Sequence, residues 1–235
     1  MLAGLFLAAG LVCSSMLATR AWMKIKNSQF VTVKGSARKN VKADLAIWNG
    51  SFTVEADSLL DAQRKLKTDM EKVAQFMNRK SVTNFIFTPI SIQELQAAKK
   101  DSSGMIEQKT VGYRLTQTVQ VQSGDVDRMV ALDRESAELV EDGLLFTAQP
   151  LEFIYTKAGE AKVEMLAEAT KDARERAEQI SKQGRRTIDS LYSAQMGVFQ
   201  ITPLYQFQTS WDGMNDTSSL DKTITAVVTA TFALK

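Results

Sequence analysis

The chain of 235 residues has no histidine and a single cysteine, Cys13. Without histidine it lacks the commonest general base and the commonest metal ligand of proteins. One cysteine cannot form a disulfide within the chain, and a thiolate zinc site would need several more ligands. The phosphate-binding patterns G-x-G-x-x-G and G-x-x-x-x-G-K-[ST] and the nucleophile pattern G-x-S-x-G are also missing. We therefore expect neither an enzyme nor a bound cofactor or metal.

Basic and acidic side chains are nearly balanced, with 29 of the first kind and 27 of the second. A general nucleic-acid binder carries a basic excess that releases counterions, so nucleic acid is not an expected partner. The hydrophobic fraction of 44% is enough for a sizeable core. The composition thus predicts a folded chain of one large domain or two small ones.

The first 19 residues contain no charged side chain. As a helix they would measure roughly 28 Å, which just crosses a bilayer. Arg20 and Lys24 can reach the headgroups and Trp22 can lie at the interface, so we predict a transmembrane signal anchor over residues 1–23 and a short linker over 24–28. A cleaved signal peptide and a lipoprotein signal with Cys13 as the lipidated residue are the alternatives.

The folded part begins with a stretch that predicts two strands around a polar turn. Val31 and Val33 alternate with polar residues, the segment 35–40 breaks the pattern, and Ala46 to Val54 alternates again. Apolar residues at helical spacing then predict a helix over 58–79. A strand over 84–92, a loop over 96–108 and a strong strand over 113–121 follow.

The second half predicts a helix over 126–140, a strand pair over 144–155 and the longest helix over 159–182. Its apolar stripe is expected to comprise Val163, Leu166, Ala169, Ala173, Ala177 and Ile180. Strands over 192–203 and 223–234 close the chain. Strand, helix and strand therefore occur twice, around helices 58–79 and 126–140, which suggests a duplication within an α+β fold of antiparallel sheet and packed helices.

The segment SWDGMNDTSSLD is the most unusual loop of the sequence. Its acidic residues do not follow the calcium-loop spacing, so a polar connection is the preferred interpretation. Tyr205, Phe207 and Trp211 lie in or near it. They either fold back onto their own core or contact a neighbouring subunit or partner, since aromatic residues are favoured at interface hot spots.

The order of the predicted strands and helices resembles that of the SIMPL-domain family of bacterial cell-envelope proteins. The resemblance covers residues 29–235 and rests on the segments VTVKG, VKADLAIW, YRLTQTVQV, AEATKDARERAEQISKQ and ITAVVTATFAL. It implies an exported α+β domain without established catalytic residues, and assembly of the kind seen in relatives that form large rings or barrels.

We therefore expect a membrane-anchored, non-enzymatic envelope protein that assembles into a ring-like or cage-like homo-oligomeric scaffold. The partners would be the lipid bilayer, through the amino-terminal helix, and other copies of the chain. Arg20, Lys24 and Lys26 follow the span and favour a cytoplasmic domain, whereas the resemblance implies the periplasmic side of the inner membrane, which we prefer. The alternative is an anchored binding module for an envelope component or small ligand, with a role in stress tolerance by analogy.

Overall fold

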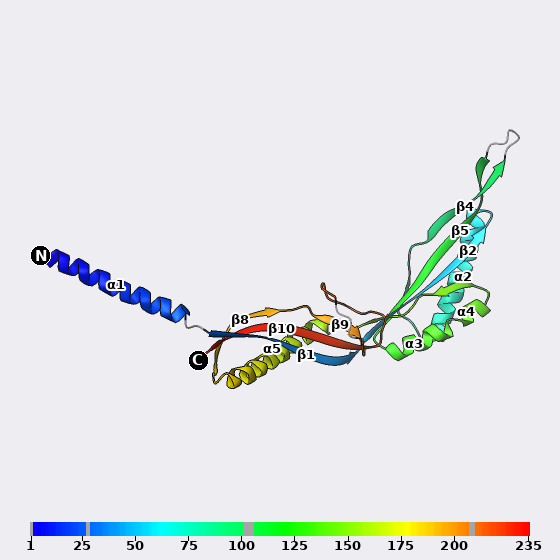
Figure 1. Ribbon diagram of the computed structural model, residues 1–235. Helices are drawn as coiled ribbons and strands as arrows, with labels where there is room; N and C mark the ends of the chain where they lie inside the picture. The colour runs from blue at the N-terminus through cyan, green and yellow to red at the C-terminus, as the bar shows by residue number, and fades with distance from the viewer. Residues whose placement is uncertain (1, 27–28, 101–105, 207–209) are drawn as a thin grey trace.

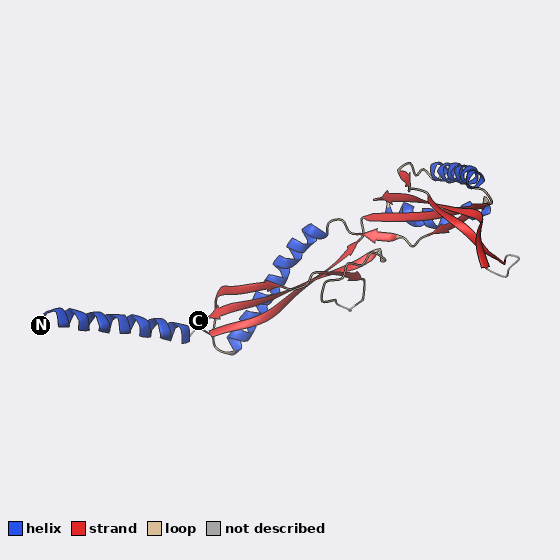
Figure 2. Cartoon of the chain, turned by 90° about the horizontal axis from the view of Figure 1, so that it is seen from above, coloured by secondary structure: helices blue, strands red, loops and turns tan. Residues whose placement is uncertain are grey.

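The computed structural model describes residues 2–26, 29–100, 106–206 and 210–235. Within these ranges, the side chains of residues 2–9, 21, 24–26, 99–100 and 106–107 lie outside the description. Figure 1 shows a long helix, α1 (Leu2–Lys26), followed by two lobes. Each lobe has its own sheet, and the two sheets follow one another along the long axis of the molecule (Figure 2).

The lobe next to α1 is built from a four-stranded sheet, which we call sheet A, and one helix. The strands lie in the order β1-β10-β8, and β9 also pairs with β10. All pairings are antiparallel. The elements are β1 (Gln29–Lys42), β8 (Ile188–Met196), β9 (Gln200–Pro203), β10 (Asp221–Leu234) and the helix α5 (Ala158–Gln183).

The polar turn expected over residues 35–40 is wrong, because this segment is the middle of β1. The strand pairs with β10 without interruption from Gln29, opposite Leu234, to Lys42, opposite Asp221. It does not pair with the strand over 45–56, which belongs to the other lobe. The polar residues of this segment alternate with Gly35 and Ala37, since one face of β1 is exposed and the other lies under α5.

Small residues let α5 lie directly on sheet A. Ala169, Ala173 and Ala177 are fully buried against Val33 and Phe232, among others. A Cβ atom at Gly35 would overlap the carbonyl oxygen of Ala169 and the backbone nitrogen of Ala173. Because both are backbone atoms, neither can rotate away. The absent side chain at Gly35 thus sets how closely helix and sheet approach.

The variant Gly35→Ala should lower the free energy of unfolding by about 1–3 kcal/mol, because helix and sheet must separate to admit the methyl group. Urea unfolding of the full chain in detergent measures this. Gly159→Ala is the matched control, since no atom lies within 4 Å of its added Cβ. Alanine favours helix, so the control should be neutral or slightly stabilising. An equal loss in both variants would contradict the close contact at Gly35.

The second lobe consists of a six-stranded antiparallel sheet, sheet B, with helices on one face. The order is β3-β5-β2-β6, with β4 also pairing with β5 and β7 with β2. Its elements are β2 (Leu45–Ala56), α2 (Leu59–Arg79), β3 (Phe85–Phe87), β4 (Ser91–Lys100), β5 (Ile106–Ser123), α3 (Val126–Glu135), α4 (Glu138–Glu141), β6 (Leu145–Ala148) and β7 (Glu152–Ile154).

Two strand-helix-strand units make up this lobe, in agreement with the repeated order of elements in the sequence. The first is β2-α2-β3 and the second is β5-α3-α4-β6. The last strand of each unit pairs with the first strand of the other unit: β3 pairs with β5, and β6 pairs with β2. This interleaved connectivity is that of the ferredoxin-like split βαβ fold.

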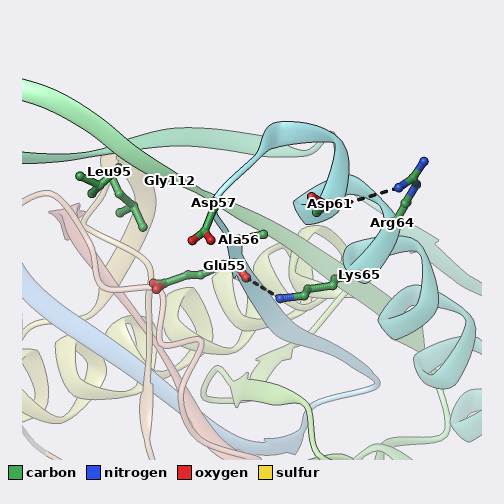
Figure 3. Close-up of a pocket in the computed structure, with 9 residues that line it drawn as sticks. Glu55, Ala56, Asp57, Asp61, Arg64, Lys65, Leu95 and Gly112 are labelled. Atoms are coloured by element: carbon green, nitrogen blue, oxygen red, sulfur yellow. Dashed lines mark hydrogen bonds and ion pairs between the residues drawn. The ribbon is translucent and has the colours of Figure 1, made fainter.

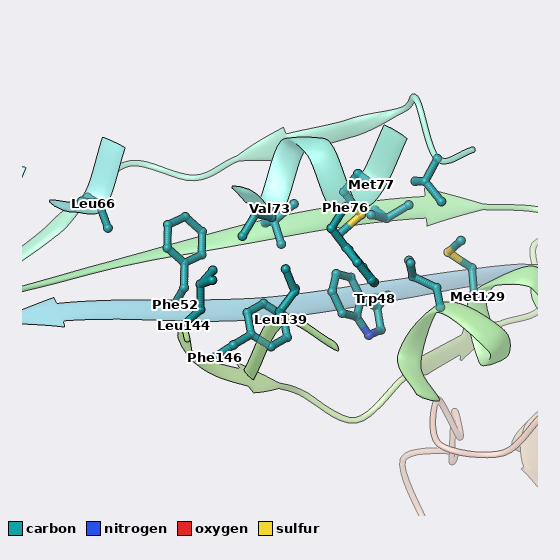
Figure 4. Close-up of a cluster of buried hydrophobic side chains, with 14 of the residues drawn as sticks. Trp48, Phe52, Leu66, Val73, Phe76, Met77, Met129, Leu139, Leu144 and Phe146 are labelled. Atoms are coloured by element: carbon teal, nitrogen blue, oxygen red, sulfur yellow. The ribbon is translucent and has the colours of Figure 1, made fainter. Parts of the chain in front are cut away.

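The core of the second lobe lies between sheet B and its helices (Figure 4). Trp48 and Phe52 of β2 are fully buried, as the alternation of this strand predicts. The Trp48 ring stacks on Phe146, and its Nε1 donates a hydrogen bond to Oδ1 of Asp133 at 3.0 Å. The core is completed by residues of the helices and by the residue that precedes β6, including Leu66, Val73, Phe76, Met77, Met129, Leu139 and Leu144.

Several expected boundaries differ from the structure. The helix over 126–140 is broken into α3 and α4. The strand over 84–92 is interrupted between β3 and β4, where Pro89 lies, and the loop over 96–108 is in large part the β4–β5 hairpin. Val163 and Ile180 are exposed and do not belong to the buried stripe of α5. The buried stripe instead includes Ala161 and Met165.

The amino-terminal segment forms one continuous helix, α1, of 25 residues. Where side chains are described, from residue 10 onward in this helix, they are exposed. The side chains of the first part of the expected span, residues 2–9, lie outside the description. No helix in the described part of the chain is both long enough and apolar enough to cross a membrane. The anchor over residues 1–23 remains a prediction.

Candidate functional site

Two of the three aromatic residues singled out in the loop between β9 and β10 are exposed to solvent. Trp211 is 96% exposed and Tyr205 is 83% exposed, so neither folds back onto the core. Phe207 lies outside the described residues. Of the expected membrane-interface anchors, Arg20 and Trp22 are exposed on α1, and the side chain of Lys24 is outside the description.

Hydrogen bonds on both sides of Trp211 fix this loop to β9. The amide of Gln200 donates to the carbonyl of Ser210 at 3.2 Å and accepts from its N–H at 3.3 Å. Farther on, the N–H of Ile201 donates to Met214, and the N–H of Asp216 donates to Ile201. The exposed ring of Trp211 is therefore presented by an anchored segment.

A buried ion pair secures the end of the loop. Lys222 at the start of β10 is fully buried, and its Nζ lies 3.0 Å from Oδ2 of Asp216. Desolvation raises the pKa of Asp216, but hydrogen bonds from Ser218, Lys222 and Ser219 outweigh it and lower the pKa to about 2. The paired carboxylate of Asp216 compensates for the burial of a lysine that would otherwise be very costly.

Replacing Asp216 with asparagine should cost about 3–5 kcal/mol at pH 7, because Lys222 would keep a buried charge without its counter-ion. The lowered pKa means that the pair stabilises the fold above the ordinary carboxyl range and that this stability is lost as the pH falls towards 2. The gap between wild type and variant should thus shrink between about pH 5 and pH 2. Urea unfolding at several pH values measures it.

The control for this prediction is Asp212→Asn, which removes an exposed carboxylate four residues away in the same loop. It should change stability by less than about 0.5 kcal/mol at any pH, as surface substitutions usually do. A gap between wild type and Asp216→Asn that does not depend on pH would contradict the role assigned to the carboxylate.

The two lobes are joined by a polar junction around Asp44, between β1 and β2. Its carboxylate accepts hydrogen bonds from the N–H and Oγ1 of Thr156 at 2.7 and 2.8 Å. Desolvation raises the pKa of Asp44, but the bonds from Thr156 outweigh it and lower the pKa. Nearby, the N–H of Ala43 donates to Leu220 and that of Phe153 donates to Thr217. The segments that cross between the lobes are thereby tied to one another.

Sheet B carries a surface hollow of about 530 Å³ beside the start of α2 (Figure 3). Charged groups line it, and several of them pair with one another. Lys65 donates to the backbone carbonyl of Glu55, and Arg64 pairs with Asp61. Arg114 binds the Glu55 carboxylate from outside the hollow. A charged ligand would have to compete with these pairs.

The outer strands of sheet A form a second candidate interaction surface. β1 and β8 pair only with β10 among the described residues, so each leaves one edge open. The side chains of β8 are almost all exposed, including Leu191, Tyr192 and Met196. Tyr192 also packs against the exposed ring of Phe30 on β1, with ring centroids 4.7 Å apart.

Sequence reasoning did not single out Leu191 and Met196. A register shift between β8 and β10 at Phe232 interrupts the alternation that would mark a strand face, and the predicted strand began only at Tyr192. The start of β8 at Ile188 was missed for the same reason.

The described residues contain no group of three or more acidic or cysteine side chains that could hold a metal ion.

These features define a two-lobed α+β protein with open strand edges and an exposed aromatic loop. The family model SIMPL, described as a protein of unknown function (DUF541), matches residues 31–232. The chain therefore belongs to the SIMPL family, as its sequence pattern predicted.

Solved structures share only a weak similarity with this chain. No curated protein matches the sequence. Among solved structures, an amidase of the hydantoinase/carbamoylase family from Burkholderia phymatum is similar at 12% identity and a TM-score of 0.24. A second, from Burkholderia multivorans, is similar at 14% and 0.23. Each match covers 54% of this chain but only 30% of the enzyme.

Proposed function

We propose that the protein is a membrane-anchored, non-enzymatic component of the bacterial envelope that assembles with copies of itself into a large ring-like or cage-like scaffold. The observation that carries the proposal is the pair of open edges on sheet A, with the exposed apolar side chains of β8 beside them. Unpaired backbone groups at the edge of a sheet pair readily with other strands.

The loop between β9 and β10 supports the same proposal. Its anchored backbone presents Trp211 at little entropic cost, and an exposed tryptophan is among the commonest hot spots of protein interfaces. Tyr205 in the same loop adds a second ring. We propose both as contacts to a neighbouring copy or partner.

In this proposal α1 holds each copy in the inner membrane as a single span over residues 1–23, and the two lobes lie in the periplasm. The uncharged run of residues 1–19 supports a span, and Arg20, Trp22 and Lys24 follow it as interface anchors. The resemblance to exported relatives supports the periplasmic side. A ring with one anchor per copy would bind the membrane by avidity.

Fusions at the carboxyl end test the orientation. Alkaline phosphatase folds to an active enzyme only outside the cytoplasm, so its fusion should be active, and a green fluorescent protein fusion exported through the same route should stay dark. The control is the pair of fusions to the chain without residues 1–23, which should give the opposite pattern. Fluorescence of the full-length fusion without phosphatase activity would contradict a periplasmic domain.

The mass of the full chain extracted in mild detergent tests the assembly. Light scattering should give a multiple of the 26.0 kDa chain, and electron microscopy should show closed particles. Trp211→Ala should reduce the assembled fraction without lowering stability, whereas Val163→Ala, at an exposed apolar site on α5, should not. A monomer at micromolar concentration would contradict the scaffold and favour the anchored binding module, for which the hollow of Figure 3 is the candidate site.

A further inference from the structure

The helix α5 lies off-centre on sheet A. Its buried alanines pack on β1 and β10, through Val33, Val228 and Phe232 among others. Gly35 lies directly under it, so the helix axis passes over β1, the outer strand on that side. On β8 only the first residue, Ile188, packs against this cluster among the described residues. One outer strand is thus covered by the helix, and the other is largely bare.

The bare strand, β8, shows apolar side chains on the side of the sheet where α5 lies. Met196 is directly opposite Val228 and Leu191 is directly opposite Phe232, two residues of β10 that face the helix. Directly opposed residues share a face of the sheet. Yet Leu191 is 49% exposed and Met196 is 47% exposed. These side chains continue the core of the lobe without a cover.

At the opposite edge, α5 overhangs the outer side of β1 and leaves a groove. Two hollows of about 510 and 750 Å³ lie along it, and both are lined by Asp172 and Glu175. The larger one is bounded by residues Thr32 to Lys34 of β1 and by Ile180 of α5, which is 55% exposed. The groove therefore combines a strand edge with a helix flank that carries Asp172, Glu175, Arg176 and Gln179 beside the apolar Ile180.

Backbone donors of β1 point into this groove. The N–H of Ser36 turns away from β10 and donates to Oδ2 of Asp172 at 2.7 Å. Because N–H directions alternate along a strand, the N–H groups of Lys34 and Thr32 point to the same outer side. Asp172 occupies the edge at Ser36, so the stretch before it is the part that can receive another strand.

We propose that β8 of one copy lies beside β1 of the next and extends sheet A from copy to copy. Leu191 and Met196 of the incoming strand then lie in the groove under α5, against Ile180. The overhang of the helix at one edge matches the bare strand at the other. This inference rests on the proposed self-assembly and names the interface that would produce it.

The direction of the strands fits anchoring in one membrane. β1 and β8 are each antiparallel to β10, so they run parallel to one another. Copies joined β8 to β1 share one orientation, and every α1 leaves the assembly at the same end (Figure 1). Pairing like edges would leave either the groove or the bare strand uncovered. A joint between two different edges repeats and closes into a ring when the rotation per copy permits.

Variants at each edge test the inference. Leu191→Lys combined with Met196→Lys charges the β8 side, and Ile180→Lys charges the groove from an exposed helix position without altering the sheet. Lys34→Pro removes one outward N–H of β1, and Lys34→Ala is its control because it keeps that N–H. Val163→Lys is the control for a new charge, since this apolar residue of α5 is 72% exposed outside the groove.

The decisive experiment mixes full-length variants in detergent and measures their mass. Each edge variant alone should have the mass of one chain, and an equal mixture of the β8 variant with the Ile180→Lys variant should reach twice that mass and no more. A dimer forms because one intact edge of each kind remains, and this rescue also shows that both variants are folded. The Val163→Lys and Lys34→Ala controls should assemble as the wild type does.

The other outcomes separate the two proposals. If the wild type assembles and the edge variants keep its full mass, the β8–β1 interface is wrong while the scaffold stands. If an edge variant alone dimerises, copies pair through like edges and the inference is overturned. If the wild type is a monomer, the proposed scaffold and the interface both fail.

Discussion

The rest of the structure depends on the antiparallel ladder between β1 and β10. It joins segments far apart in the sequence, since the paired hydroxyls of Thr32 and Thr231 lie 199 positions apart. Sheet A is therefore built from two separate parts of the sequence, one before and one after the second lobe. The second lobe occupies the contiguous stretch between β1 and α5. The ladder also supplies the surface on which α5 packs, and through it the two unlike edges of the sheet.

Much of this fold is legible in the sequence, because burial on one face produces a clear period. The helical spacing of α2 and the alternation of β10 were predictable, as was the SIMPL family itself. The middle of β1 was not. Its exposed residues are polar, Gly35 is buried and Ala37 is half-buried. A short local pattern cannot distinguish a small residue that lets a helix approach from one that makes a turn.

The candidate interaction surface was only partly predictable for a related reason. Sequence reasoning identified Trp211 and Tyr205, because large rings in a polar loop are unusual, but it could not decide whether they fold inward. Leu191 and Met196 are candidate contact residues because α5 does not cover them. That depends on where α5 lies on the sheet, which is set by backbone contact at Gly35 and leaves no periodic signal in the sequence of β8.

The long sequence separation of the terminal ladder also has a kinetic consequence. The second lobe is made of consecutive elements with comparatively local contacts, so it can fold as soon as its own segment of the chain has been synthesised. Sheet A cannot form until β10 has emerged, because β8 and β1 are both held through that strand. Sheet A therefore has no finished edge during synthesis, and the interface proposed above becomes available only once β10 has paired.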